Sequence, residues 1–370
     1  MERYAKRDDL RELSGYHSPQ VSVDVRLNTN ESPIAPPAEF VDAVAAAVRD
    51  VQWNRYPDRT AKALREDIAA LHGVDADNVF VANGSNEVLQ SLLLAYSGAG
   101  RNVVTFEPTY QLHSHIARIA GATVVSGRRN ADFTLDVEEV TRTCKHYSPS
   151  VTFLCSPNNP TGLAESQESI RAAVDATPGI VLVDEAYAQF SPHSALHMVR
   201  EDARIAVSRT YSKTWSMAAV RLGYLIAPKW MVADLEIVAL PYRLDALKQA
   251  AGRAALRYVD QMEQAVREVI AQRERLVASM SKLPLTVWPS QANFILFRPQ
   301  VGAVNGASSA AVASGSSGRA LWQALLDQSV LVRDCSSWDG LTDCLRVTVG
   351  TAAENDRFLT ALQTALQARD

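Results

Sequence analysis

The stretch Ile205-Ala-Val-Ser-Arg-Thr-Tyr-Ser-Lys213 contains the pattern that indicates the fold, an apolar run followed by polar residues. Its first three residues are apolar, which is typical of a buried strand, and the strand ends among hydroxyl side chains that surround a single lysine. Lys213 alone indicates little, because most lysines of a globular protein lie in solvent. The stretch gains meaning because the same order, an apolar run followed by polar residues, recurs along the chain.

From residue 79 onward, short apolar runs alternate with polar loops and helical stretches. Most of these runs are continuously apolar, as expected for strands that helices cover on both faces. Seven such strands predict an α/β fold with a doubly wound, mainly parallel sheet. The predicted strands are Val79–Ala82, Val103–Phe106, Thr123–Val125, Val151–Cys155, Ile180–Val183, Ile205–Ser208 and Tyr224–Ala227.

The chain divides into three predicted parts. Residues 1–35 form an arm with a short strand at Val23–Leu27, and the arm joins the smaller domain or a second subunit. Residues 36–245 form a large domain that contains the seven-stranded sheet. Residues 246–370 form a small α+β domain, because fewer strands follow there. Its predicted elements are a helical region from Asp245 to Met280, strands at Phe294–Phe297, Val330–Arg333 and Leu345–Val349, helices at Ala320–Leu326 and Glu354–Ala368, and an Ala/Ser/Gly-rich flexible insertion at 301–318.

Composition excludes several classes of function. The chain has 370 residues and a net charge of −4, so there is no basic excess to bind nucleic acid. We expect no signal peptide, because the N-terminus is charged, and no apolar run reaches the ~18 residues that a membrane helix needs. The four cysteines lack a C-x-x-C spacing, which indicates free thiols in a reducing cytoplasm and no metal site.

Polar residues follow five of the predicted strands at the point where each strand ends. Parallel sheets bind ligands at the carboxyl ends of their strands, so these groups are expected to meet. Each has an ordinary alternative, such as a helix cap, a solvated acid or a plain turn. Their joint occurrence at one sheet edge favours a ligand site. The segments are Asn83-Gly-Ser-Asn-Glu87, Glu107-Pro-Thr-Tyr110, Ser156-Pro-Asn-Asn-Pro-Thr-Gly162, Asp184-Glu-Ala-Tyr187 and Thr210-Tyr-Ser-Lys213.

This combination matches what a pyridoxal phosphate site requires. A lysine forms the Schiff base, and an acid keeps the pyridine nitrogen protonated. A helix N-terminus, hydroxyl groups and an arginine bind the phosphate, and an aromatic ring covers the cofactor. Arg221, eight residues after Lys213, precedes its strand instead of following it. For Arg221 to reach the same edge, the strand Tyr224–Ala227 must run antiparallel to the others.

With these motifs, the chain resembles the fold-type I pyridoxal-phosphate aminotransferases of class I/II over essentially its whole length. Within them it is most similar to the histidinol-phosphate aminotransferases. The further motifs that carry the resemblance are Leu27-Asn-Thr-Asn-Glu-Ser-Pro33, Asn54-Arg-Tyr-Pro-Asp58, Ser212-Lys213 with Arg221, and Cys344-Leu-Arg-Val-Thr-Val-Gly350.

The resemblance implies a role for each cofactor-binding residue. Lys213 is the Schiff-base lysine and moves protons, and Asp184 pairs with the pyridine nitrogen. Tyr56 is expected to reach the phosphate from the other subunit of a homodimer with shared active sites. The remaining implied contacts are Asn159 and Tyr187 to the ring 3′-oxygen, Tyr110 stacked on the ring, and Ser85, Asn86, Thr210, Ser212 and Arg221 to the phosphate.

The resemblance also implies that Arg346 binds the substrate anion, with Arg333, Tyr16 and Asn159 as helpers. The residue pattern agrees for Arg346, because in Leu345-Arg-Val-Thr-Val349 the apolar residues alternate with Arg346 and Thr348, which share one face. An arginine fork suits a carboxylate and a phosphate equally, so this residue does not choose the substrate.

The predicted reaction is therefore the transamination of histidinol phosphate with 2-oxoglutarate, a step of histidine biosynthesis. An aromatic amino-acid aminotransferase is the main alternative, and a phosphothreonine-type decarboxylase or a non-catalytic cofactor-binding sensor are weaker ones. The chain departs from the family at Thr214-Trp215, at Ala218-Ala-Val-Arg221 and at Ser32. A nicotinamide-dependent dehydrogenase is disfavoured, because no G-x-G-x-x-G follows the first strand.

Overall fold

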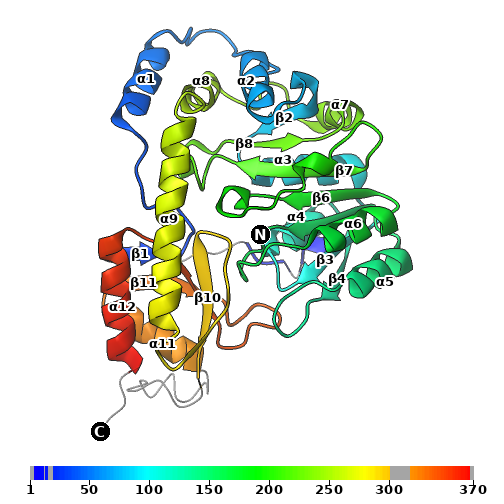
Figure 1. Cartoon of the computed structure of the whole chain (residues 1–370). Coiled ribbons are helices and arrows are strands. Elements are labelled where there is room, and N and C mark those ends of the chain that lie inside the picture. The colour runs from blue at the N-terminus through cyan, green and yellow to red at the C-terminus, as the bar shows by residue number, and fades with distance from the viewer. Residues whose placement is uncertain (1–3, 12, 16–19, 301–316, 367–370) are drawn as a thin grey trace.

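The structure, a computed structural model, describes residues 4–11, 13–15, 20–300 and 317–366. Two sheets lie side by side (Figure 1). The larger sheet has seven strands in the order β2-β8-β7-β6-β5-β3-β4, which confirms the predicted α/β fold. Its strands are β2 Val79–Ala82, β3 Asn102–Glu107, β4 Thr123–Arg128, β5 Val151–Cys155, β6 Ile180–Asp184, β7 Ile205–Thr210 and β8 Gly223–Ile226.

Strand β8 runs antiparallel to both of its neighbours, β2 and β7, while the other pairs of this sheet are parallel. The direction predicted from Arg221 is thus confirmed. Thr210 at the end of β7 pairs with Gly223 at the start of β8. The reversal therefore brings Arg221 to the same sheet edge as Lys213.

Helices cover both faces of this sheet because alternate strand residues point to opposite sides. On β6, Leu182 packs in the cluster formed with α3, α4 and α7, whereas Val181 and Val183 pack toward α5 and α6. A third cluster joins β2 and β8 to the remaining helices of this region. The helices are α1 Ala38–Arg49, α2 Lys62–His72, α3 Ser85–Tyr96, α4 Gln111–Ile119, α5 Val137–Tyr147, α6 Gln167–Ala176, α7 Lys229–Val238 and α8 Ala246–Ala255.

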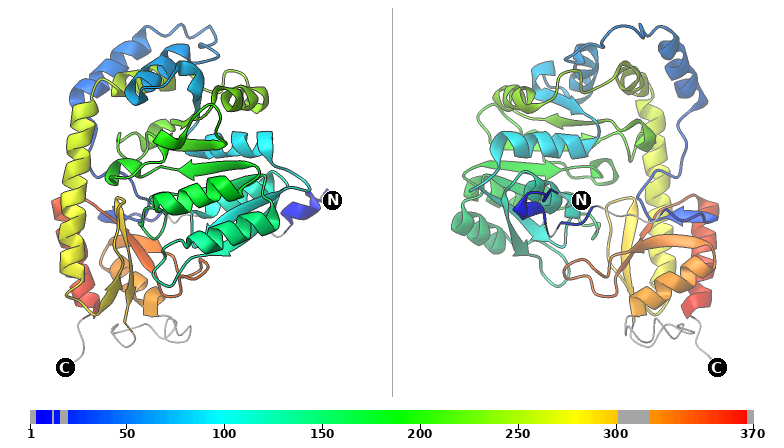
Figure 2. Two further views of the ribbon diagram at one scale, coloured as in Figure 1. Left: turned by 45° about the vertical axis from the view of Figure 1, so that its right-hand side comes forward. Right: turned by 180° about the vertical axis from the view of Figure 1, so that it is seen from behind.

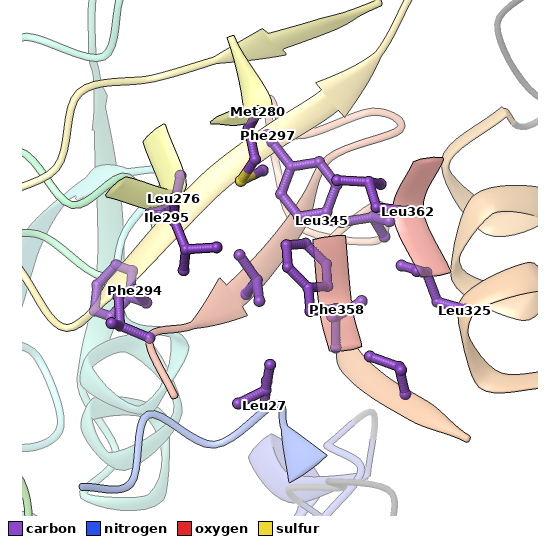
Figure 3. Packing of buried hydrophobic residues seen from close by; sticks show 14 of the residues in the cluster. Leu27, Leu276, Met280, Phe294, Ile295, Phe297, Leu325, Leu345, Phe358 and Leu362 are labelled. Carbon is purple, nitrogen blue, oxygen red and sulfur yellow. The ribbon is translucent and has the colours of Figure 1, made fainter. Parts of the chain in front are cut away.

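The second sheet has the order β1-β11-β12-β10-β9. Strand β1 comes from the N-terminal arm and pairs parallel with β11. Phenylalanine and leucine side chains of β10, β12 and α12 meet those of α9 in its core (Figure 3). The elements are β1 Val25–Leu27, α9 Val259–Met280, β9 Leu285–Val287, β10 Phe294–Pro299, α11 Ser317–Asp327, β11 Val330–Asp334, β12 Leu345–Thr348 and α12 Ala352–Leu366.

Three details differ from the sequence-based expectation. The helical region from Asp245 is two helices, because the chain leaves helical structure between α8 and α9, and the short strand β9 was not predicted. Residues 301–316 of the expected insertion lie outside the described residues. Its last two residues instead begin α11, where the Gly318 amide donates to Asp343 Oδ1 at 2.7 Å.

Helix α9 runs along one side of the molecule and spans the height of both sheets (Figure 2). Its upper part packs near α1 and α8, and its lower part contributes Leu276 and Met280 to the core of the second sheet. None of the described helices has the length and apolar character needed to cross a bilayer. Polar residues from both sheets line one cavity, which is the candidate site.

Candidate active site

A cavity of about 220 Å³ lies at the carboxyl ends of the parallel strands and receives side chains from both sheets. The structure brings almost all of the predicted site residues together there. Those that line it are Ser85, Asn86, Tyr110, Asn159, Asp184, Tyr187, Thr210, Ser212, Lys213, Arg221, Arg333 and Arg346.

Lys213 lines the cavity just beyond the end of β7. Its Nζ donates to the Thr29 carbonyl at 3.1 Å and lies 5.8 Å from the centroid of the Tyr187 ring. Burial, together with the nearby positive charge of Arg346, lowers the pKa of Lys213 to about 8. The amine is therefore neutral in a larger fraction of molecules near neutral pH than an ordinary lysine is, and a neutral amine is a nucleophile and a base.

Asp184 ends β6 and is only 2% exposed. Its Oδ1 accepts from Ser208 Oγ at 3.0 Å, and its Oδ2 lies 3.1 Å from His113 Nε2. The His113 ring stacks on Phe153 with a centroid separation of 4.7 Å. These contacts fix the carboxylate in the wall of the cavity, where it can pair with a protonated ring nitrogen.

The N-terminus of α3, the loop after β7 and Arg221 form a cup lined by polar groups. Arg221 Nη1 donates to Ser212 Oγ at 3.3 Å, and Thr210 Oγ1 donates to the same Ser212 oxygen at 3.0 Å. A Cβ on Gly84 would lie 2.9 Å from Arg221 Nη2, so the absence of a side chain there lets the guanidinium approach the helix. Amide groups of a helix start, hydroxyls and a guanidinium suit a phosphate dianion.

Two tyrosines complete this part of the cavity. Tyr110, which precedes α4, places its ring edge-on to His113, and its hydroxyl donates to Asn86 Oδ1 at 3.4 Å. The Tyr187 hydroxyl oxygen accepts from Asn30 Nδ2 at 2.9 Å. Burial raises the pKa of Tyr187, so its phenol remains protonated and can donate to a ligand.

Arg333 and Arg346 are directly opposite each other on the antiparallel strands β11 and β12, so both side chains project from the same face of the sheet. Arg346 is 5% exposed and donates to the Asn28 carbonyl at 3.0 Å and to Asn159 Oδ1. Its buried Nε has no acceptor among the described residues. Thr348 bonds to Asn30 beside it, which agrees with the face predicted for Arg346 and Thr348.

Tyr56, which was expected to serve the other subunit, does not line the cavity of its own chain. Tyr56 is 78% exposed and stacks on Tyr242 with a centroid separation of 4.4 Å. Tyr16 lies outside the described residues.

Other residues that contact the site had received no role from the sequence. Asn28, Thr29 and Asn30 had been quoted only as part of a motif, and they touch three different site residues. His113 lies on the buried face of α4, one turn after Tyr110. The sequence indicated its role only by placing a polar residue on an otherwise apolar face of a helix. Trp338 lines the cavity with its ring centroid 5.9 Å from the Arg333 guanidinium.

Comparisons with known proteins agree with this geometry. A family model described as aminotransferase class I and II matches residues 22–362. A histidinol-phosphate aminotransferase of Thermobifida fusca is 45% identical, over 97% of this chain and 95% of that protein. One of Frankia casuarinae is 44% identical, over 96% of this chain and 89% of that protein.

A solved structure shows the same fold. The histidinol-phosphate aminotransferase of Sinorhizobium meliloti, crystallised in complex with pyridoxal-5′-phosphate, superposes with a TM-score of 0.81. The two chains are 22% identical, and the match covers 93% of this chain and 91% of that one.

Proposed function

The chain belongs to the family of class I and II aminotransferases, and from that premise we propose that it transfers an amino group between histidinol phosphate and 2-oxoglutarate, with pyridoxal phosphate as cofactor. Two curated relatives are 44–45% identical to this chain over nearly its whole length. Both are named histidinol-phosphate aminotransferase, which supports this substrate.

The residues of the cavity fit the cofactor. The cup around Ser212 and Arg221 suits its phosphate, Asp184 lies where an acid can face a ring nitrogen, and Tyr187 and Asn159 can reach a ring oxygen. When bound, pyridoxal phosphate supplies an aldehyde for amines and a ring that withdraws electrons from the substrate carbon. Asp184 would support that withdrawal by pairing with the ring nitrogen.

Lys213 Nζ performs the proton transfer. In its neutral form it can take the proton from the substrate carbon that bears the amine. The lowered pKa of about 8 places this group near the operating pH of a general base. Thr29 holds the amine inside the cavity through its carbonyl oxygen, so Nζ stays close to Tyr187 and Arg346.

The structural observation that fits this substrate is the pair Arg333 and Arg346, which lie directly opposite each other on neighbouring strands. Histidinol phosphate and 2-oxoglutarate both bring two negative charges, and guanidinium groups can pair with a phosphate or a carboxylate. The choice of histidinol phosphate over an aromatic amino acid rests on the names of the relatives.

Single-turnover rates with histidinol phosphate and with phenylalanine test this proposal. We expect histidinol phosphate to react faster, and Arg333→Gln to lower kcat/KM for histidinol phosphate by roughly 10- to 100-fold, because one or two charge-assisted hydrogen bonds are lost. The rate with phenylalanine should change little. Arg298→Gln, an exposed arginine on β10, is the matched control. A wild-type preference for phenylalanine would refute the proposed substrate.

We further propose a homodimer in which Tyr56 completes the cavity of the partner. Large apolar side chains are exposed on two segments that the stacked pair Tyr56–Tyr242 joins. Trp53, Ile237 and Leu240 are 71%, 81% and 74% exposed. Such a concentration of exposed apolar surface is typical of a protein interface, and a two-fold dimer covers the same patch on both subunits.

A cytoplasmic location is also proposed. It is supported by the four cysteines, all of which are free thiols buried in the structure. Free thiols are typical of proteins in a reducing compartment.

A further inference from the structure

Three consecutive residues of the N-terminal arm each hold a different side chain of the site. They follow β1 directly. The Asn28 carbonyl accepts from Arg346 at 3.0 Å, the Thr29 carbonyl accepts from Lys213 Nζ at 3.1 Å, and Asn30 Nδ2 donates to the Tyr187 hydroxyl oxygen at 2.9 Å. The arm thus lines the cavity and is hydrogen-bonded to Arg346, Lys213 and Tyr187.

All four polar groups of Asn30 have partners. Its backbone amide donates to Thr348 Oγ1 at 2.9 Å, and its backbone carbonyl accepts from Asn293 Nδ2 at 3.1 Å. Its side-chain Oδ1 accepts from the Thr348 hydroxyl at 3.2 Å, and Nδ2 faces Tyr187. The residue is 1% exposed and has φ +55°, a left-handed conformation that asparagine tolerates better than most residues.

The two ends of the Asn30 amide have different partners. Thr348 Oγ1 accepts from the Asn30 backbone amide and donates its one hydrogen to Asn30 Oδ1. The amide NH₂ is the end that faces the phenol. Since an NH₂ group cannot accept a hydrogen bond, the phenol proton of Tyr187 cannot point toward Asn30.

We propose that Asn30 is a positioning residue that occupies the Tyr187 oxygen as an acceptor and thereby directs the phenol proton into the cavity. The inference rests on the proposed role of Tyr187 as a cofactor ligand. A ligand oxygen in the cavity then meets a donor whose orientation is already set, which reduces the reorganisation that binding requires.

The strands that support Asn30 also carry the two arginines. Strand β1, just before the segment, pairs with β11, which bears Arg333, and Thr348 lies two residues after Arg346 on β12. A shift of β12 would therefore move the substrate arginine and the support of Asn30 together. The arm connects the second sheet to Tyr187, which follows β6 of the first sheet.

A double-mutant cycle of Asn30→Gly and Tyr187→Phe tests the proposal. Glycine adopts φ +55° without strain, so Asn30→Gly removes the side chain while keeping the backbone conformation. The readouts are the dissociation constant of pyridoxal phosphate, titrated by visible absorption, and the pH midpoint of the visible band. We expect each single variant to weaken binding by roughly 3- to 10-fold, which is the effect of one hydrogen bond.

The double variant should bind within about twofold of Tyr187→Phe, because Asn30 acts through Tyr187. Multiplied losses in the double variant would overturn the proposal. Asn30→Asp provides a second test if the glycine variant is unstable. Its carboxylate accepts the phenol proton, so we expect pyridoxal phosphate to bind more weakly than to Asn30→Gly and the pH midpoint of the visible band to rise. Unchanged binding and an unchanged midpoint in Asn30→Asp would also overturn it.

Asn355→Ala is the matched control, because Asn355 is a buried asparagine that bonds to the backbone of Gly350 at 2.9 Å and lies outside the cavity. It should lose stability without changing either cofactor readout. None of these readouts involves the amino donor. If histidinol phosphate is not a substrate, the expected non-additivity of the Asn30 and Tyr187 substitutions still holds. If that non-additivity is not found, the proposed substrate is unaffected.

Discussion

Lys213 destabilises the cofactor-free protein at neutral pH, because burial and the charge of Arg346 oppose its protonated form. Its folded-state pKa of about 8 lies below its ordinary value of 10.5, so the unfolded chain binds more protons between these two values. The stability of the wild-type protein should therefore rise as the pH increases from 8 to 10.5, and the destabilising effect is fully present below pH 8.

Lys213→Met should consequently stabilise the cofactor-free protein by about 1–2 kcal/mol at pH 7, and this gain should shrink toward pH 10. Urea unfolding of both proteins at the two pH values measures the effect. Lys62→Met, which removes an exposed lysine of α2, should change the stability by less than about 0.5 kcal/mol at either pH. A gain of equal size at both pH values would show that packing, and not the charge, causes it.

The start of helix α3 illustrates how an element builds part of the site. Gly84 and Gly100 both have a positive φ, +78° and +77°, which at Gly84 is combined with a ψ of 169°. An alanine at either position costs about 1–3 kcal/mol of stability, because L-residues avoid positive φ. Only at Gly84 does the added Cβ meet another group, the Arg221 guanidinium at 2.9 Å, while at Gly100 no atom lies within 4 Å.

Gly84→Ala and Gly100→Ala should therefore both lose stability but differ in cofactor binding. Displacement of Arg221 removes a charge-assisted contact to the phosphate, so we expect Gly84→Ala to weaken pyridoxal phosphate binding roughly tenfold. Gly100→Ala should bind it within about twofold of the wild type. Thermal unfolding and a visible-absorption titration measure the two effects separately, and equal losses of affinity would remove Arg221 from the proposed cup.

The elements that the sequence predicted best were those with a strong local signal. The strands of the large sheet are runs of buried apolar residues, and the position of Arg221 predicted the direction of β8 correctly. Strand β9 has three residues, too few for a pattern. The break between α8 and α9 was missed because the apolar stripe continues through Leu256 and Tyr258, which still pack in the core.

The contacts of the site were harder to predict than its members. Residues after neighbouring strands meet because the sheet brings them together, so the cavity could be anticipated from their order. The bond between Asn30 and Tyr187 joins residues 157 positions apart and depends on how the arm pairs with β11. Residue patterns carry local periodicity but not such long-range register, so the role of the arm emerged only from the structure.

At the scale of the whole molecule, the predicted site residue Tyr56 does not line the cavity of its own chain. Its position bears on how many chains form one active site. Tyr56 is exposed and stacks on Tyr242, among other exposed apolar side chains, while Lys213 is enclosed in the cavity. If Tyr56 serves the partner, inactive Tyr56→Ala and Lys213→Ala chains complement each other, because a mixed dimer contains one site with both native residues.

Mixing the two variants in equal amounts under conditions of subunit exchange should restore about a quarter of the wild-type activity, since random pairing makes about half of the dimers mixed and each has one intact site. Asp184→Asn mixed with Lys213→Ala is the control, because both residues line one cavity of one chain and every site keeps a defect. Activity that never exceeds the sum of the two parents would mean that each chain builds its site alone. In that case Tyr56 has no catalytic partner to reach, and its exposed aromatic pair serves the interface only.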